Sequence, residues 1–178
     1  ALAVAACAAV LGGCGAPPVQ KAESRGTFYP PLPNPVRIQH LTTISGERDV
    51  GGEQGGEFAR FVLGEDARSQ RLRQPYGVAL YKGKIYVADT GAPGLAVFDL
   101  ARKSFALITG GANGRMRRPI NVTIDADGSK YVTDTGRDQV LVFDADDRFV
   151  AAFGTQGQFK PVDTAVIGNR LYVVDIQH

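Results

Sequence analysis

Carboxylates recur at regular intervals in the second half of the chain, and they are the first residues that could carry chemistry. Asp89, Asp134 and Asp175 each close a short apolar run that contains a tyrosine. A carboxylate can act as an acid or base or hold a metal ion, but an aspartate at a strand end usually accepts hydrogen bonds from the backbone of the following turn. The pattern therefore favours a structural turn role for these three residues.

A second group of polar side chains stands near the start of the same repeats. Tyr76, Asn121 and Asp163 hold equivalent or adjacent positions, each shortly after a proline. An amide and a carboxylate on neighbouring repeats could bind a hard cation such as calcium through oxygen. Local turn hydrogen bonds are the favoured interpretation for Asn121 and Asp163, and a polar ligand site without metal is a third alternative.

Other catalytic patterns are missing from the sequence. His40 and His178 have no cysteine or histidine partner at metal-binding spacing. The sequence has no Ser-His-Asp arrangement, no phosphate-binding glycine loop and no dinucleotide-binding motif. We therefore expect no catalytic residues and no cofactor, apart from the divalent cation considered above.

Basic residues gather just before each repeat begins. The net charge is only +2, so this basic character is local and gives no argument for nucleic acid as a partner. If these connections open on one side of the fold, that side forms a basic face for an anionic partner, such as lipid headgroups, an acidic polymer or an acidic protein. A solvated rim is the alternative. The residues are Arg68, Arg71, Arg73, Arg115, Arg117, Arg118 and Lys160.

An internal repeat must position all of these side chains. The text at 85–91 returns at 130–136 and again, in part, at 171–175, with a period of about 40 to 45 residues, which is typical of propeller blades. Each full unit reads as four short strands separated by turns rich in Gly, Asp and Asn. The first unit has expected strands at 78–81, 84–89, 95–99 and 104–109. The second has them at 122–125, 130–134, 139–144 and 149–153, and a third unit begins at Pro161 with two strands. Earlier strands are expected at 37–44 and 58–63.

The repeats resemble the NHL-repeat family of β-propellers. The resemblance is carried by Pro75-Tyr76-Gly77-Val78-Ala79, the segment 85–91 and Val97-Phe98-Asp99, and by their counterparts 119–123, 130–136 and 142–144. It implies an all-β, partial propeller with about three four-stranded blades of a probable six. It also implies that Tyr76, Asn121 and Asp163 surround a central channel, where gluconolactonase-like propellers hold a metal through oxygen ligands. Asn121 and Asp163 depart from the family pattern, which has glycine there.

The front of the chain predicts export and a lipid anchor. Residues 1–13 are uncharged and too short to span a bilayer, so they fit the remnant of a signal peptide. Leu11-Gly12-Gly13-Cys14 resembles a bacterial lipobox with Cys14 as the lipidated residue. Residues 14–36 are rich in proline, and we expect an extended linker rather than part of a sheet. Residues 37–178 then form the partial propeller, truncated at its C-terminus.

Together these features predict a lipid-anchored, exported propeller that serves as a binding or scaffold module at the bacterial cell envelope, facing the periplasm or the cell surface. Its partners would be a protein or an anionic envelope component, and the membrane through the anchor, with no nucleic acid. The alternative is a metal-dependent hydrolase or lactonase with its site in the central channel. Because apolar end faces of a partial propeller stay exposed, we expect this piece to be unstable alone.

Overall fold

The computed structural model describes residues 27–31, 33–51 and 70–177, and the chain divides into two units, 1–43 and 44–178. Several predictions lie outside the described residues: the signal-peptide remnant at 1–13, the lipidated Cys14, Arg68 and the strand expected at 58–63. No helix among the described residues is long and apolar enough to cross a membrane.

The first unit contains a two-stranded antiparallel sheet. Strand β1 (Thr27–Tyr29) pairs with β2 (Ile38–His40), and all residues of both strands are exposed. The prediction that residues 14–36 lie outside any sheet was therefore wrong for Thr27–Tyr29. Pro30, Pro31, Pro33 and Pro35 stand in the connection between the strands, where they remove no paired N–H group. The strand expected at 37–44 is shorter than predicted.

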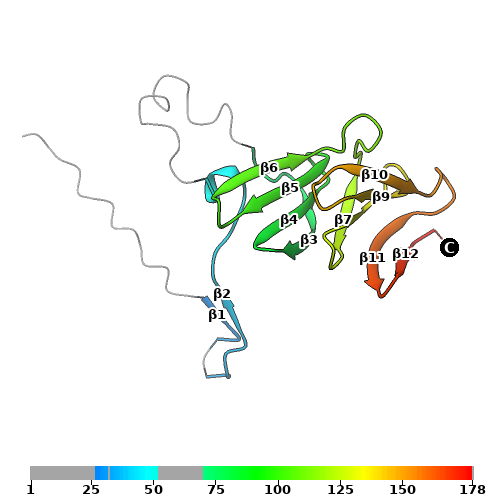
Figure 1. Cartoon of the computed structure of the whole chain (residues 1–178). Coiled ribbons are helices and arrows are strands. Elements are labelled where there is room, and N and C mark those ends of the chain that lie inside the picture. The colour runs from blue at the N-terminus through cyan, green and yellow to red at the C-terminus, as the bar shows by residue number, and fades with distance from the viewer. Residues whose placement is uncertain (1–26, 32, 52–69, 178) are drawn as a thin grey trace, which may run out of the picture. The chain divides into compact units, whose positions relative to one another are not determined.

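The second unit begins with a short 3₁₀ helix, η1 (Glu47–Asp49), followed by two four-stranded antiparallel sheets and one hairpin (Figure 1). In both four-stranded sheets consecutive strands are neighbours. The first sheet comprises β3 (Pro75–Tyr81), β4 (Lys84–Asp89), β5 (Gly94–Asp99) and β6 (Ser104–Ile108). The second sheet comprises β7 (Pro119–Ile124), β8 (Lys130–Asp134), β9 (Gln139–Phe143) and β10 (Phe149–Phe153). The third hairpin comprises β11 (Pro161–Ile167) and β12 (Arg170–Asp175).

The prediction of an all-β fold is thus confirmed, since the strands form antiparallel sheets. Some strands begin earlier than predicted. Strands β3 and β7 begin at Pro75 and Pro119 rather than at Val78 and Val122. A register irregularity follows each of these prolines, and the same irregularity follows Pro161 in β11. Because a bulge accommodates an extra residue without ending a strand, each strand continues back to its proline, whose missing N–H is tolerated there.

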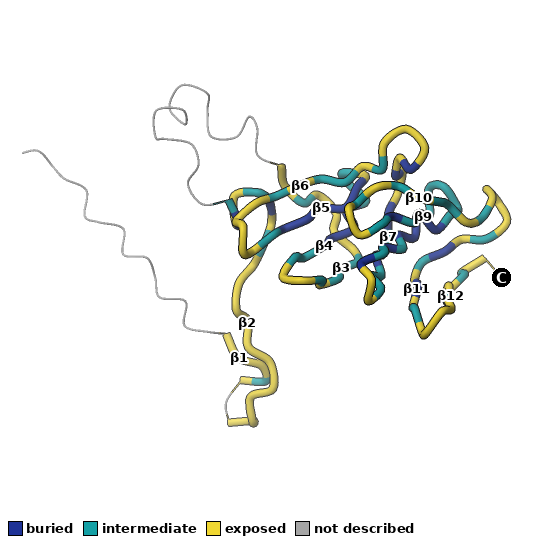
Figure 2. Tube along the Cα trace, viewed as in Figure 1, coloured by how far each residue is buried: buried dark blue, intermediate teal, exposed yellow. Residues whose placement is uncertain are grey.

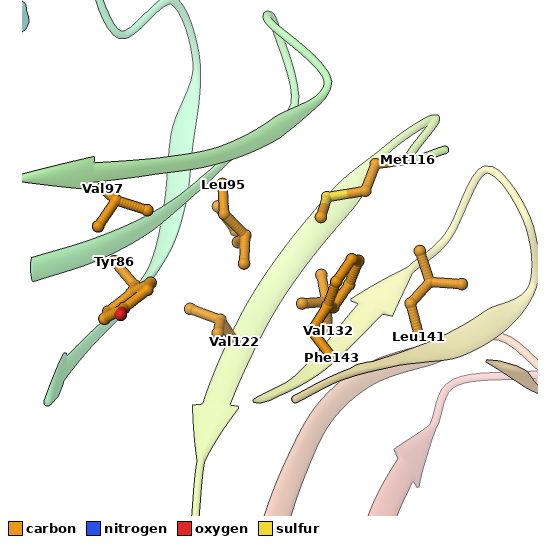
Figure 3. Packing of buried hydrophobic residues seen from close by; sticks show 9 residues of the cluster. Tyr86, Leu95, Val97, Met116, Val122, Val132, Leu141 and Phe143 are labelled. Carbon is orange, nitrogen blue, oxygen red and sulfur yellow. The ribbon is translucent and has the colours of Figure 1, made fainter. Parts of the chain in front are cut away.

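The sheets pack through their first strands, with β3 beside β7 and β7 beside β11 (Figure 1). Facing residues of the first and second sheets enclose the main core, which Figure 3 shows at close range and Figure 2 places among the buried parts of the trace. Full burial of a Val, Leu, Phe or Met side chain stabilises the folded state by roughly 1.5–3 kcal/mol. The core residues are Tyr86, Ala88, Leu95, Val97, Met116, Val122, Val132, Leu141 and Phe143.

The other face of the first sheet is covered by the start of the unit. Val50 packs with Val87, Ala96 and Phe98, and Ile44 and Leu72 border this second cluster. Two backbone hydrogen bonds join the segment around η1 to the segment that precedes β3. The Glu47 N–H donates to the Gln70 carbonyl (2.9 Å), and the Leu72 N–H donates to the Ser45 carbonyl (2.8 Å).

Strand register defines two sides of the second unit. We call the side where β3, β7 and β11 begin and β4, β8 and β12 end the connection side, because the chain crosses from one sheet to the next there. The opposite side, which carries the β3–β4, β5–β6, β7–β8, β9–β10 and β11–β12 turns, is the hairpin side. The pairs that mark the connection side are Pro75 with Asp89, Pro119 with Asp134, and Pro161 with Asp175.

Candidate functional site

Asp89 ends β4 on the connection side and serves the backbone. Its carboxylate accepts hydrogen bonds from the N–H groups of Arg73 (2.7 Å), Gln74 (2.8 Å), Gly91 (2.9 Å) and Ala92 (3.2 Å). Two of these donors belong to the turn that follows the strand. The other two belong to the connection that precedes β3, which the sequence did not reveal because only folding brings that connection to the strand end.

Asp134 repeats this arrangement at the end of β8. It accepts from the N–H groups of Arg117 (2.6 Å), Arg118 (2.9 Å), Gly136 (2.9 Å) and Arg137 (3.1 Å). Its side chain is fully buried, as is that of Asp89. Because each buried carboxylate accepts four backbone N–H groups, its geometry fits the structural turn role that the sequence favours.

Asp175 occupies the third copy at the end of β12. It accepts from the N–H groups of Lys160 (2.8 Å) and Gln177 (2.9 Å). Each of the three aspartates thus accepts hydrogen bonds from backbone N–H groups of a basic connection. The basic side chains of these connections take no part in the contacts and project from the connection side.

The basic side chains of the connection side are exposed. Among the described residues, the ion pairs lie on the hairpin side: Arg102 with Asp99 (4.0 Å), Arg148 with Asp146 (3.5 Å) and the buried Lys130 with Asp147 (2.7 Å). No ion pair between described residues involves five cations of the opposite side, which are Arg73, Arg115, Arg117, Arg118 and Lys160. Arg71, the remaining described member of the predicted basic face, is also exposed.

Arg137 is a further residue of this side that sequence reasoning missed. Its guanidinium donates hydrogen bonds to the Arg115 carbonyl (2.9 Å) and to Oε1 of Gln139 (2.8 Å). It lies in the turn after Asp134 rather than in a connection, so a search of the connections could not find it. Arg137 joins the turn of the second sheet to the β6–β7 connection.

The predicted channel residues lie along the first strands. The side-chain amide of Asn121 donates a hydrogen bond to Oδ1 of Asp163, which also accepts from the Thr164 N–H (2.7 Å). On the other side of Asn121 lies Gly77, where an added Cβ would stand 2.2 Å from Oδ1 of Asn121. Tyr76 is 62% exposed, and it is Gly77, its neighbour in β3, that meets Asn121.

As arranged, Asn121 presents an N–H donor rather than an oxygen to Asp163. No group of three or more His, Cys, Asp or Glu side chains that could hold a metal ion occurs in the part of the chain that the structure describes. The two side chains form a polar pair that joins β7 to β11.

Threonines extend this polar seam between the second sheet and the third hairpin. The Thr123 hydroxyl donates to the Thr164 carbonyl (2.6 Å), and the Thr164 hydroxyl donates to the Thr123 hydroxyl (2.8 Å). The Thr133 hydroxyl donates to the Val162 carbonyl (3.2 Å). The third hairpin is therefore attached mainly by hydrogen bonds, whereas the first two sheets share an apolar core.

Tyrosines of the repeats are poor candidates for acid–base chemistry. Burial, with a smaller contribution from the negative charge of Asp147, raises the pKa of Tyr86 to about 12. Burial also raises the pKa of Tyr131. Both phenols therefore stay protonated at neutral pH.

Comparison with protein-family models and with curated proteins finds no match for this chain.

Proposed function

We propose that this chain is part of an NHL-type β-propeller, exported and anchored to lipid through Cys14, that acts as a binding module at the bacterial cell envelope. Two sheets of the same four-stranded order lie with their first strands side by side, and a third hairpin continues the series. Blades of a propeller pack in this way, which supports the architecture.

The observation that carries the binding role is the contrast between the two sides. Cations of the hairpin side lie among several aspartates, and three of them, Arg102, Lys130 and Arg148, form ion pairs. On the connection side, five exposed cations have no ion-pair partner among the described residues, and the strand-end aspartates there accept backbone N–H groups instead. Unpaired charges of one sign on one face attract an oppositely charged partner and speed its association. The partner we propose is therefore an anionic protein or envelope component.

Charge reversal on the connection side tests this function. The double variant Arg117→Glu with Arg118→Glu should lower retention on an immobilised sulfated polymer by about tenfold or more, and the retention of the unaltered protein should fall as salt rises. The matched control is Arg102→Glu with Arg170→Glu, which reverses two exposed cations on the hairpin side. Equal retention of both variants and of the unaltered protein would remove the basic face from the proposal.

The anchor has its own test. Incorporation of labelled palmitate in a bacterial host should depend on Cys14, since a diacylglycerol group gives stable membrane attachment. It should not depend on Cys7, which also follows a lipobox-like tripeptide in the sequence. Labelling that survives Cys14→Ala would contradict the anchor.

A second candidate, a metal-dependent hydrolase or lactonase, would use Asn121 and Asp163, whose side chains meet on adjacent first strands. Binding of calcium there would require the Asn121 side chain to turn its amide oxygen toward the ion. Calcium should then raise the melting temperature of the protein by mass action, and Asp163→Ala should abolish the rise. An unchanged melting temperature at millimolar calcium would leave the polar pair as a structural contact.

A further inference from the structure

A cavity of about 450 Å³ opens on the connection side, between the β4–β5 turn of the first sheet and the β6–β7 connection. Its volume falls within the range of about 300–1,000 Å³ that is usual for ligand pockets. The residues that line it are Pro93, Thr109, Gly111, Ala112, Arg115 and Met116.

The lining combines one cation with polar and apolar surface. Arg115 is exposed and has no ion-pair partner among the described residues, and Thr109 adds a hydroxyl group. Pro93 and Ala112 are exposed and contribute the apolar surface, whereas Met116 is only 2% exposed and lies behind them in the core. A single guanidinium matches a carboxylate, which it can hold by two parallel hydrogen bonds, and apolar walls suit a short methylene stem.

Backbone hydrogen bonds stabilise the conformation of the β6–β7 connection, which carries Arg115. The Gly114 N–H donates to the Gly110 carbonyl (3.0 Å) and the Met116 N–H donates to the Thr109 carbonyl (3.1 Å). The Arg115 carbonyl accepts the guanidinium of Arg137 (2.9 Å). Because this contact uses the backbone of Arg115, the side chain of Arg115 can be replaced without removing the contact.

The second sheet has a carboxylate at the corresponding turn, and that carboxylate contacts the connection to the next hairpin. Asp138 holds the same position in the β8–β9 turn that Pro93 holds in the β4–β5 turn, since both turns join strands paired in the same register. The Asp138 carboxylate accepts a hydrogen bond from the Gly157 N–H of the β10–β11 connection (3.0 Å). The Phe159 ring packs against Gly154, where an added Cβ would lie 1.9 Å from a ring carbon.

We infer that the pocket beside Arg115 receives an acidic side chain of a partner protein, in the place that Asp138 fills within the second sheet. This inference rests on the proposed function and names the partner of the basic face. A flat membrane surface cannot enter the pocket between Pro93 and Ala112, and an extended sulfated or phosphorylated polymer brings no methylene stem to these two residues. The neighbouring Arg117 and Arg118 are exposed and supply the longer-range attraction.

The test uses the full chain and a fluorescein-labelled hexaglutamate amide, with binding followed by fluorescence anisotropy. Arg115→Gln removes the cation, and Ala112→Trp fills the cavity without changing the charge. Each should weaken peptide binding by about tenfold, the effect of losing one charge-assisted pair. The controls Arg102→Gln and Ala101→Trp make the same changes at exposed positions of the hairpin side and should bind the peptide as the unaltered protein does.

The possible outcomes distinguish a failure of the pocket inference from a failure of the proposed binding function. If Arg115→Gln and Ala112→Trp bind the peptide normally while Arg117→Glu with Arg118→Glu does not, the basic face stands and the pocket inference is overturned. If the unaltered protein does not bind the peptide but binds heparin or phosphatidylglycerol vesicles, the pocket inference is also overturned. If the charge-reversed double variant matches the unaltered protein with every probe, the proposed function falls as well.

Discussion

The ammonium nitrogen of Lys130 lies 2.7 Å from Oδ1 of Asp147, although the Lys130 side chain is completely buried. The same nitrogen donates to the carbonyls of Gly128 (3.1 Å), Asp144 (2.8 Å) and Ala145 (3.3 Å). Lys130 therefore ties the β7–β8 turn to the β9–β10 turn on the hairpin side. The contact with Asp147 is an ion pair rather than an aligned hydrogen bond, since that buried oxygen has no regular hydrogen-bond donor.

Removing the cation should be costly. We expect Lys130→Met to lower the free energy of unfolding by about 3 kcal/mol, because it leaves the Asp147 carboxylate near the interior without its partner. Urea denaturation measures the change. Arg148→Met is the matched control, since the Arg148–Asp146 pair is exposed and should contribute less than about 1 kcal/mol. Equal effects of the two substitutions would contradict the role assigned to Lys130.

The carboxylate of Asp134 supports a second stability prediction. Asp134→Asn keeps the size of the side chain but replaces one acceptor oxygen with a donor that faces backbone N–H groups. We expect a loss of about 3 kcal/mol in the free energy of unfolding, because four partly buried N–H groups lose a charged acceptor. The control is Asp146→Asn, whose side chain is 71% exposed in the ion pair with Arg148. A cost under about 1 kcal/mol for Asp134→Asn would show that other acceptors can replace the carboxylate.

Much of the fold follows from the sequence because the repeat is nearly regular. The limits of β4, β8 and β10 agree with the alternation of apolar runs and turns. Pairing between β1 and β2 was not predictable from the sequence. Strand β1 has only three residues and lies within a proline-rich segment, and all residues of both strands are exposed, so no buried apolar pattern marks them. The early starts of β3 and β7 depend on bulges, which leave no distinct residue signal beyond the proline.

The candidate site was predictable only in part. Repeat equivalence placed Asn121 and Asp163 on neighbouring units, and their side chains meet. The buried Lys130 was not foreseen, because lysine is almost always exposed unless a specific partner is present. Asp138 and Pro93 look like ordinary turn residues, and only the comparison of two folded connections shows that one supplies a carboxylate where the other leaves a cavity.

Gly77 and Asn121 should be coupled. An alanine at Gly77 would place its Cβ 2.5 Å from the Cα of Asn121 and 2.2 Å from its Oδ1, so Gly77→Ala requires β3 and β7 to separate. We expect a loss of about 2 kcal/mol in the free energy of unfolding, in the range for overpacked sites. The double variant Gly77→Ala with Asn121→Gly should recover about half of that loss, beyond the cost of Asn121→Gly alone. Additive effects of the two substitutions would mean that the strands adjust independently.

The raised pKa of Tyr86 predicts how stability changes at alkaline pH. The pKa of this phenol lies at about 12 in the folded protein against 10.0 for an unperturbed tyrosine, because burial disfavours the phenolate. The unfolded chain therefore loses this proton first, so the contribution of Tyr86 to stability is complete below pH 10.0 and is lost as the pH rises toward about 12. Tyr86→Phe should flatten the fall in the free energy of unfolding across this window, since phenylalanine does not ionise. An ultraviolet titration in which every tyrosine ionises near pH 10.0 would contradict the burial of this side chain between the sheets.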